Sequence, residues 1–192
     1  MPEATVELAD LRLTSERYFA LVAEGVLHPD DRVELLEGVV VARSPQNPPH
    51  AAATSRAYRT LVAGIGDRAA VRVQMPLVLG RHSVPEPDVA VVPGRESDYD
   101  RAHPTTALLI VEVADSSLAQ DRITKTRIYA AAGILEVWIL NLRDDCVEVF
   151  RDPDPATRSY RTTRSVPRGE RLALASFPDA QVEIDALLPV HD

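Results

Sequence analysis

An acidic residue inside an apolar strand pattern is the feature that most constrains this chain. Residues 108–114 read Leu-Leu-Ile-Val-Glu-Val-Ala, so Glu112 is the only charge in an otherwise apolar run. A carboxylate in such a setting is strongly destabilising unless another group compensates its charge. The fold must therefore bring a partner to Glu112, and the search for that partner is a search for function.

A strand-helix-strand unit surrounds this acid. Alternation along the strand, about 107–113, predicts one shared face for Leu108, Ile110, Glu112 and Ala114. A helix is expected over about 118–132, with side chains spaced four apart on one face at Asp121, Lys125 and Tyr129. Gly133 ends the helix, and 137–140 is a buried strand. Such a unit has parallel strands and a right-handed crossover.

The helix carries the only lysine of the chain. Of the 21 basic residues, 20 are arginine and one is Lys125. Both residue types suit a solvated surface, but lysine is a compact point charge whose pKa is readily shifted. The position of this single lysine just after Glu112 favours a functional role. The alternative is a surface pair with Asp121, which contributes a few tenths of a kcal/mol.

The remaining pattern predicts further helices and strands. Helices are expected over 14–27 and about 50–64, the second with buried positions at Ala53, Tyr58, Leu61 and Val62. Residues 33–42 read as two short strands around a tight Glu37-Gly38 turn. Further strands are expected within 70–79, at 89–92 and at 146–151, then a hairpin-like segment over 152–165 and a short strand and turn within 172–188.

Two more acids and a histidine share the setting of Glu112. Glu34 lies in a short apolar strand, and Asp88 follows Pro87 at the mouth of the apolar strand 89–92. His50 opens a helix after a Pro-rich loop and could approach a phosphate or a metal-bound water. Each has a plainer interpretation: Glu34 as an edge-strand residue facing water, Asp88 as a turn residue, and His50 as a polar residue at a helix start.

Composition sets the class. A chain of 192 residues is expected to form a single domain over 1–192. No apolar run approaches the roughly 20 residues of a membrane helix, and the N-terminus has no signal pattern, so a cytoplasmic protein is expected. Cys146 alone cannot form an internal disulfide. The net charge of −8 argues against a general nucleic-acid coat protein but permits a nuclease with an acidic metal site.

Three acids and a later lysine could act together on a phosphate group. Two or three converging carboxylates are oxygen ligands for Mg²⁺ or Mn²⁺, which also bridges to substrate phosphate. A nearby lysine stabilises charge on the phosphate under attack or positions a water. The set Glu34, Asp88, Glu112 and Lys125 therefore fits phosphodiester hydrolysis.

The chain resembles a known family at these residues. Pro87-Asp88, Glu112-Val113, the segment from Asp121 to Gly133 and Val137-Trp138 resemble the Uma-two family of bacterial endonucleases, in the PD-(D/E)xK restriction-endonuclease-like superfamily. Glu34-Leu-Leu-Glu-Gly38 and Pro-Pro-His50 are also similar, so the resemblance spans roughly 14–152. It implies an α/β domain with a mixed sheet flanked by helices, a core over about 14–152 and a β-rich C-terminal extension over 153–192. It also implies Mg²⁺-dependent hydrolysis of DNA.

The resemblance also implies roles. Asp88 and Glu112 would be metal ligands, Glu34 a supporting acid, Lys125 the catalytic lysine, and His50, Asp121 and Tyr129 supporting or substrate-contacting groups. The superfamily usually has lysine two residues after the glutamate, where this chain has Ala114. Two alternatives follow: a catalytically inactive interaction or regulatory protein on a nuclease fold, and a hydrolase of small phosphodiesters. By analogy with nucleases that cut both strands, a homodimer is expected.

Overall fold

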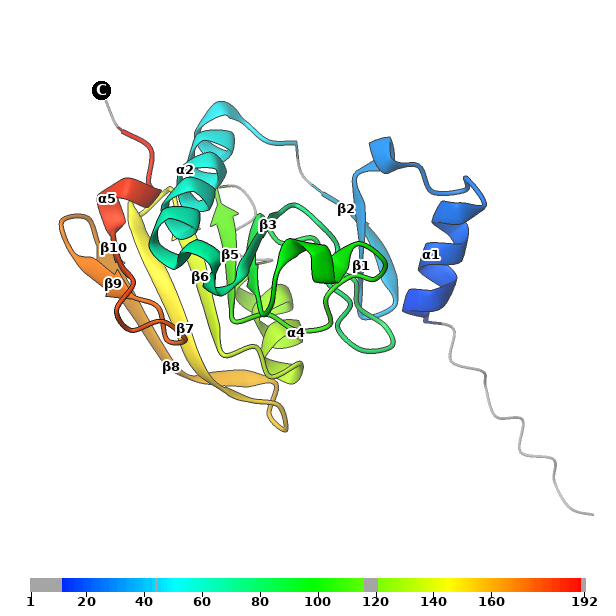
Figure 1. Cartoon of the computed structure of the whole chain (residues 1–192). Coiled ribbons are helices and arrows are strands. Elements are labelled where there is room, and N and C mark those ends of the chain that lie inside the picture. The colour runs from blue at the N-terminus through cyan, green and yellow to red at the C-terminus, as the bar shows by residue number, and fades with distance from the viewer. Residues whose placement is uncertain (1–11, 44, 116–120, 191–192) are drawn as a thin grey trace, which may run out of the picture.

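The centre of the protein is a six-stranded mixed sheet. In the computed structural model, which describes residues 12–43, 45–115 and 121–190, the strand order is β3-β4-β5-β6-β7-β8 (Figure 1). The strands are β3 (Ala70–Val73), β4 (Val89–Val92), β5 (Leu109–Ala114), β6 (Glu136–Asn141), β7 (Cys146–Asp154) and β8 (Ser159–Pro167). β5 and β6 are parallel and the other neighbours are antiparallel, which confirms the predicted parallel pair around Glu112.

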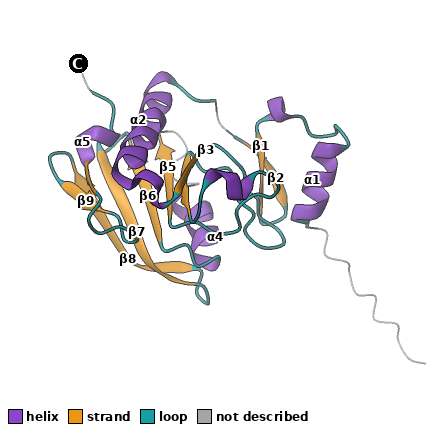
Figure 2. Ribbon diagram, viewed as in Figure 1, coloured by secondary structure: helices purple, strands orange, loops and turns teal. Residues whose placement is uncertain are grey.

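Helices cover both faces of this sheet (Figure 2). α2 (Pro48–Ile65) packs on one face through Ala53, Ala57 and Leu61, against inward side chains that include Val111 and Val113 of β5. α4 (Thr126–Ala131) packs on the other face through Ile128 and Tyr129, against Ile110 and Ala114. β5 therefore separates two apolar cores, and Glu112 shares the α4 side because it alternates with Ile110 and Ala114.

Three expected orientations are wrong. Tyr58 and Val62 of α2 are 36% and 40% exposed, because the buried stripe follows the four-residue spacing of Ala53, Ala57 and Leu61. Leu108 precedes β5 and packs against the α2-side core instead of sharing the face of Glu112. Within 70–79, where one or two strands are expected, the structure has one strand, β3 (Ala70–Val73).

A separate hairpin lies beside the sheet. β1 (Val33–Leu36) and β2 (Val39–Ala42) pair antiparallel around a two-residue turn, Glu37-Gly38, as predicted. Both turn residues have positive φ (50° and 85°), which is the geometry that tight hairpins require. Leu35 forms an isolated bridge with Val84, and both side chains pack with Tyr18 of α1 (Ser15–Ala23).

The C-terminal segment completes the core on the α2 side. β9 (Arg171–Ala173) and β10 (Gln181–Glu183) form a two-stranded sheet, and α5 (Ile184–Leu187) follows next to α2 (Figure 1). Short 3₁₀ turns are η1 (Pro29–Asp31), η2 (Gly66–Arg68) and η3 (Glu96–Tyr99). Over the described residues, no helix has the length and apolar character needed to cross a membrane.

Candidate active site

Asp88 and Glu112 meet on neighbouring strands. The β4–β5 register pairs Val89 with Val111, and one further step along both strands brings Asp88 opposite Glu112. Side chains of directly opposed residues lie on the same face with Cβ atoms about 4.5–5.5 Å apart. Both residues are buried, at 5% and 2% exposure. The rigid Pro87 before Asp88 and the apolar strand around Glu112 thus bring two carboxylates together inside the protein.

Asp88 is held as a carboxylate by four groups. Its Oδ2 accepts from the Val113 amide at 2.9 Å and lies 3.3 Å from His50 Nε2, while Oδ1 accepts from Gln74 Nε2 at 3.0 Å. Burial raises the pKa of Asp88, but the hydrogen bond and charge of His50, the Val113 amide and the charge of Lys125 together bring it below its usual value. The group is therefore ionised at neutral pH.

Glu112 has the partner that its sequence setting demands. Lys125 Nζ lies 3.2 Å from Oε1 and 3.3 Å from Oε2, and the Tyr129 hydroxyl donates to Oε1 at 2.5 Å. Lys125 and Tyr129 come from the segment after β5, as the spacing of four residues predicts. Asp121, the third residue of that series, begins the segment, but its side chain lies outside the part of the chain that the structure describes.

The segment that carries Lys125 is not an ordinary α-helix at its start. η4 (Asp121–Lys125) is a turn of π-helix that continues directly into α4. Turns of this kind widen a helix by one residue and often occur at functional sites. Here the π turn ends at Lys125, whose side chain is 8% exposed and extends to Glu112 on β5.

Glu34 reaches the site from the separate hairpin. Its Oε1 lies 3.3 Å from Lys125 Nζ, and its Oε2 accepts from the Glu86 amide at 3.0 Å. Glu34 is 2% exposed, so the interpretation as an edge-strand acid facing water does not hold. Lys125 thus lies between Glu34 and Glu112, residues that are 78 positions apart in sequence.

Two members of the site were not expected from the sequence. Arg43 binds Glu86 Oε2 at 2.8 Å and lies 3.9 Å from Asp88 Oδ1. Burial raises the pKa of Glu86, Arg43 lowers it and the charge of Glu34 raises it again, with a net upward shift. The only signal in the sequence is the placement of Glu86 between two prolines, which fixes an extended backbone next to Asp88.

The charges of this cluster favour a divalent cation. Four carboxylates, from Glu34, Glu86, Asp88 and Glu112, contact two permanent cations, Arg43 and Lys125. The four carboxylates thus outnumber the two permanent cations, and a divalent cation such as Mg²⁺ or Mn²⁺ would offset this negative surplus.

The ligand count also fits an ion of this kind. Across residues 12–43, 45–115 and 121–190, no three side chains of His, Cys, Asp or Glu converge closely enough to bind a metal on their own. Mg²⁺ commonly takes one or two protein carboxylates and completes its shell with water and substrate phosphate. The donor set therefore fits a substrate-assisted Mg²⁺ site rather than an all-protein cage.

The fold and the site together define a class of protein. A mixed sheet flanked by helices, with buried acids at adjacent strand ends and a lysine beside them, is the architecture of restriction-endonuclease-like proteins. The chain belongs to the Uma2 family, described as "Putative restriction endonuclease", which it matches over residues 15–189.

A solved structure has the same fold. The crystal structure of a "putative nuclease belonging to DUF820" from Anabaena variabilis ATCC 29413 superimposes with a TM-score of 0.71. The match is 16% identical in sequence and covers 91% of this chain and 97% of the other. A comparison with curated proteins finds no match.

Proposed function

We propose that the protein is a metal-dependent endonuclease that hydrolyses phosphodiester bonds of DNA. The observation that carries this proposal is the buried cluster itself: Glu112 and Glu34 contact Lys125, the charge of Lys125 also lowers the pKa of Asp88, and the cluster keeps a negative surplus. Such a surplus inside a protein is strongly destabilising, so a chain retains it when a cation and a phosphate are to be bound. Family membership agrees with this chemistry.

Asp88 and Glu112 would hold the ion, because they are opposed on adjacent strands and their carboxylates have acceptor sites beyond their protein hydrogen bonds. A Mg²⁺ or Mn²⁺ ion bound there supplies Lewis acidity and a lowered pKa for a bound water. Tyr129 fixes the orientation of Glu112, and the Val113 amide and Gln74 fix that of Asp88.

Lys125 would act on the phosphate. Hydrolysis adds water to phosphorus, breaks a phosphorus–oxygen bond and leaves extra negative charge on the phosphate oxygens. The ammonium of Lys125 is 3.2–3.3 Å from Glu112 and Glu34, and a phosphate bound beside Glu112 would bring that developing charge close to it. Glu34 would keep Lys125 charged and oriented. His50 Nε2 lies 3.3 Å from Asp88 Oδ2, so His50 would be close to the bound ion.

Cleavage of plasmid DNA tests the proposal. Wild-type protein should convert supercoiled plasmid to nicked or linear DNA with Mg²⁺ or Mn²⁺, and EDTA should abolish the reaction. Asp88→Asn, Glu112→Gln and Lys125→Met should each reduce the rate by about 10²–10³-fold, as removal of a transition-state-stabilising group does. Asp179→Asn makes the same chemical change at an exposed surface pair and should cleave like the wild type.

One observation favours a second candidate, an inactive protein on a nuclease fold. Lys125 contacts both oxygens of Glu112, and the usual strand position for the lysine holds Ala114. Titration calorimetry separates the two candidates. The nuclease proposal requires Mn²⁺ binding that Asp88→Asn and Glu112→Gln abolish, whereas an inactive protein would bind no divalent ion and cut neither DNA nor RNA.

A further inference from the structure

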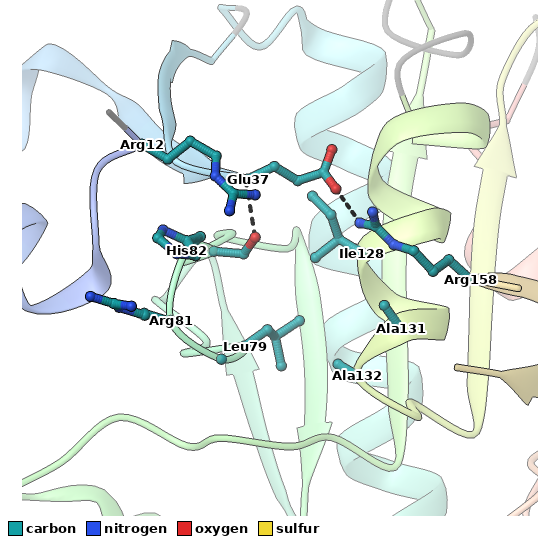
Figure 3. Close-up of a pocket in the computed structure, with 11 residues that line it drawn as sticks. Arg12, Glu37, Leu79, Arg81, His82, Ile128, Ala131, Ala132 and Arg158 are labelled. Atoms are coloured by element: carbon teal, nitrogen blue, oxygen red, sulfur yellow. Dashed lines mark hydrogen bonds and ion pairs between the residues drawn. The ribbon is translucent and has the colours of Figure 1, made fainter. Parts of the chain in front are cut away.

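A polar pocket lies beside α4, the helix that directly follows Lys125. It has a volume of about 280 Å³ and is enclosed by four segments: the β1–β2 turn, the turn at Gly80–Ser83, α4 and the β7–β8 turn (Figure 3). Its apolar floor is formed by Leu79, Ile128, Ala131 and Ala132. We call it the arginine pocket after the charged residues on its wall, Arg12, Arg81 and Arg158.

The arginine pocket reverses the charge of the molecule locally. The chain carries a net charge of −8, yet three arginines and His82 line this pocket and only one acid, Glu37, stands among them. Glu37 is ion-paired to Arg158 and also to Arg127 (Figure 3 shows the Arg158 contact). Among the described residues, the exposed guanidinium of Arg81 has no ion-pair partner. The charge of Arg81 is therefore available to an anion that enters the pocket.

Backbone hydrogen bonds hold the wall of the pocket rigid. The Gly38 amide donates to His82 at 2.6 Å, the Leu13 amide to Gly38 at 2.9 Å, and the Ser15 amide to Arg81 at 2.7 Å, in each case to the carbonyl oxygen. Gly38 also lets Arg12 approach, because a Cβ at this position would lie 2.4 Å from the Arg12 Cβ. The three segments are thus joined before any ligand arrives, which reduces the entropy lost on binding.

The pocket shares its elements with the candidate active site. The hairpin that supplies Glu34 to Lys125 also supplies Glu37, and the helical segment that supplies Lys125 also supplies Ile128 and Ala132. Lys125, Ile128 and Ala132 are spaced three and four residues apart, so they lie along one helix face. At about 1.5 Å of rise per residue, Ala131 and Ala132 are about 9–10.5 Å along the axis from Lys125.

We propose that the arginine pocket binds a backbone phosphate of the nucleic-acid strand close to the bond to be cut. This proposal rests on the proposed nuclease function. A nucleic-acid strand carries a negative phosphate at every nucleotide, so a strand held at Lys125 would bring a neighbouring phosphate near the pocket. Arg81, Arg158 and Arg12 supply the planar guanidinium groups that match phosphate oxygens.

Glu37 sets the strength of this contact. Although burial raises the pKa of Glu37, the hydrogen bonds and charges of Arg158 and Arg127 lower it below its usual value, so the acid remains charged. It orients two arginines and at the same time competes with a phosphate for them. Replacing Glu37 with glutamine keeps the shape and removes the competing charge, and so should tighten binding.

Binding to a labelled oligonucleotide tests the pocket apart from cleavage. Fluorescence anisotropy with a fluorescein-labelled 20-nucleotide DNA in EDTA gives affinity and its salt dependence without hydrolysis. Arg81→Gln and Arg158→Gln should each weaken binding several-fold at low salt and reduce the salt slope by about one. Glu37→Gln should tighten binding by a similar factor. Matched controls are Arg171→Gln and Glu183→Gln, an exposed Arg–Glu pair at the β9–β10 sheet, which should bind like wild type.

The outcomes separate this proposal from the nuclease proposal. Asp88→Asn should lose cleavage and keep the dependence of binding on Arg81 and Arg158. Wild-type protein that cuts no DNA, but whose DNA binding still depends on Arg81 and Arg158, would overturn the nuclease proposal and support the pocket proposal. Arg81→Gln and Arg158→Gln proteins that remain folded by circular dichroism and bind DNA like the controls would overturn it. A second result would also overturn it: inorganic phosphate raises the melting temperature of the wild type but not of Arg81→Gln, while Arg81→Gln binds DNA like the wild type. The pocket would then be a binding site for a small anion.

Discussion

Tyr129 contributes to the site by a hydrogen bond to Glu112. Its hydroxyl donates to Glu112 Oε1, and hydrogen bonds to charged acceptors contribute about 1.5–3 kcal/mol. We expect Tyr129→Phe to lower the free energy of unfolding by about this amount in urea denaturation. Because groups that orient a metal ligand affect metal affinity by about 10–100-fold, we also expect weaker Mn²⁺ binding and slower cleavage.

Tyr160→Phe is the matched control for this change. The Tyr160 hydroxyl donates to the Ile134 carbonyl at 2.8 Å, and burial raises the pKa of Tyr160 well above its usual value, so it remains a donor. Loss of a bond to a neutral acceptor costs about 0.5–1.5 kcal/mol. Cleavage by this variant should match the wild type. Equal cleavage by both variants would contradict the role given to Tyr129.

Lys125 makes a large contribution to stability because it is the cation between two buried acids. Removing one partner of a buried ion pair costs about 3–5 kcal/mol, so we expect Lys125→Met to unfold at lower urea concentration. The double variant Glu34→Gln/Lys125→Met should be more stable than the sum of the two single changes predicts, because one uncompensated charge is gone. Additive effects of the two changes would show that Lys125 and Glu34 are not coupled.

At the scale of elements, Lys125 lies on a helical segment, whereas the superfamily usually has its lysine on the strand of the glutamate. Ala114 lies on the same face of β5 as Glu112, is fully buried, and contacts the α4-side core. We expect Lys125→Ala to be inactive and Ala114→Lys/Lys125→Ala to regain part of the activity, because the new side chain enters the space that Lys125 leaves. Overpacking costs about 1–3 kcal/mol, so melting temperature must be measured alongside plasmid cleavage. A folded double variant without activity would show that only the helix can present the lysine.

The start of α2 places His50 against Asp88. Asn47 caps this helix by accepting from the His50 amide at 3.0 Å, and its Nδ2 donates to Asp115 at 2.6 Å. Loss of such a cap costs about 0.5–2 kcal/mol. We expect Asn47→Ala to lower the melting temperature by a few degrees and to slow cleavage. Thr14→Ala removes the cap of α1 and should lower stability similarly with little effect on cleavage.

Local pattern predicted the strands and the tight turn around the site, but not every element or every contact. The apolar run around Glu112, its parallel partner and the Glu37-Gly38 turn follow from periodicity and turn chemistry. The buried face of α2 could not be predicted in this way. Apolar residues at Tyr58 and Val62 as well as at Leu61 are compatible with more than one buried face. The π turn before Lys125 and the pairing of Arg43 with Glu86 have no local signature, since one depends on helix geometry and the other on distant segments.

At the scale of the molecule, the site joins two units of unequal stability. The six-stranded sheet carries Asp88 and Glu112, whereas the two-stranded hairpin carries Glu34. A two-stranded hairpin is marginal by itself and depends on what it packs against. β2 is largely exposed, with Val39 at 59% exposure, so the hairpin is held through β1 and the turn: by the Leu35–Val84 bridge, the Glu34–Lys125 ion pair, and the hydrogen bonds and ion pairs of Gly38 and Glu37.

The separate attachment of the hairpin predicts that it opens locally while the six-stranded sheet remains folded. Regions with few buried contacts exchange amide hydrogens by local opening at low free energy. In hydrogen-exchange mass spectrometry, residues 33–42 should exchange before residues 109–114 of β5. Glu34→Gln should accelerate exchange in the hairpin and leave β5 unchanged, because it weakens the ion pair that ties the two units together. Asp179→Asn, an exposed change, should alter neither segment. Equal acceleration across the hairpin and β5 would mean that they unfold as one unit and that Glu34 stabilises the whole protein.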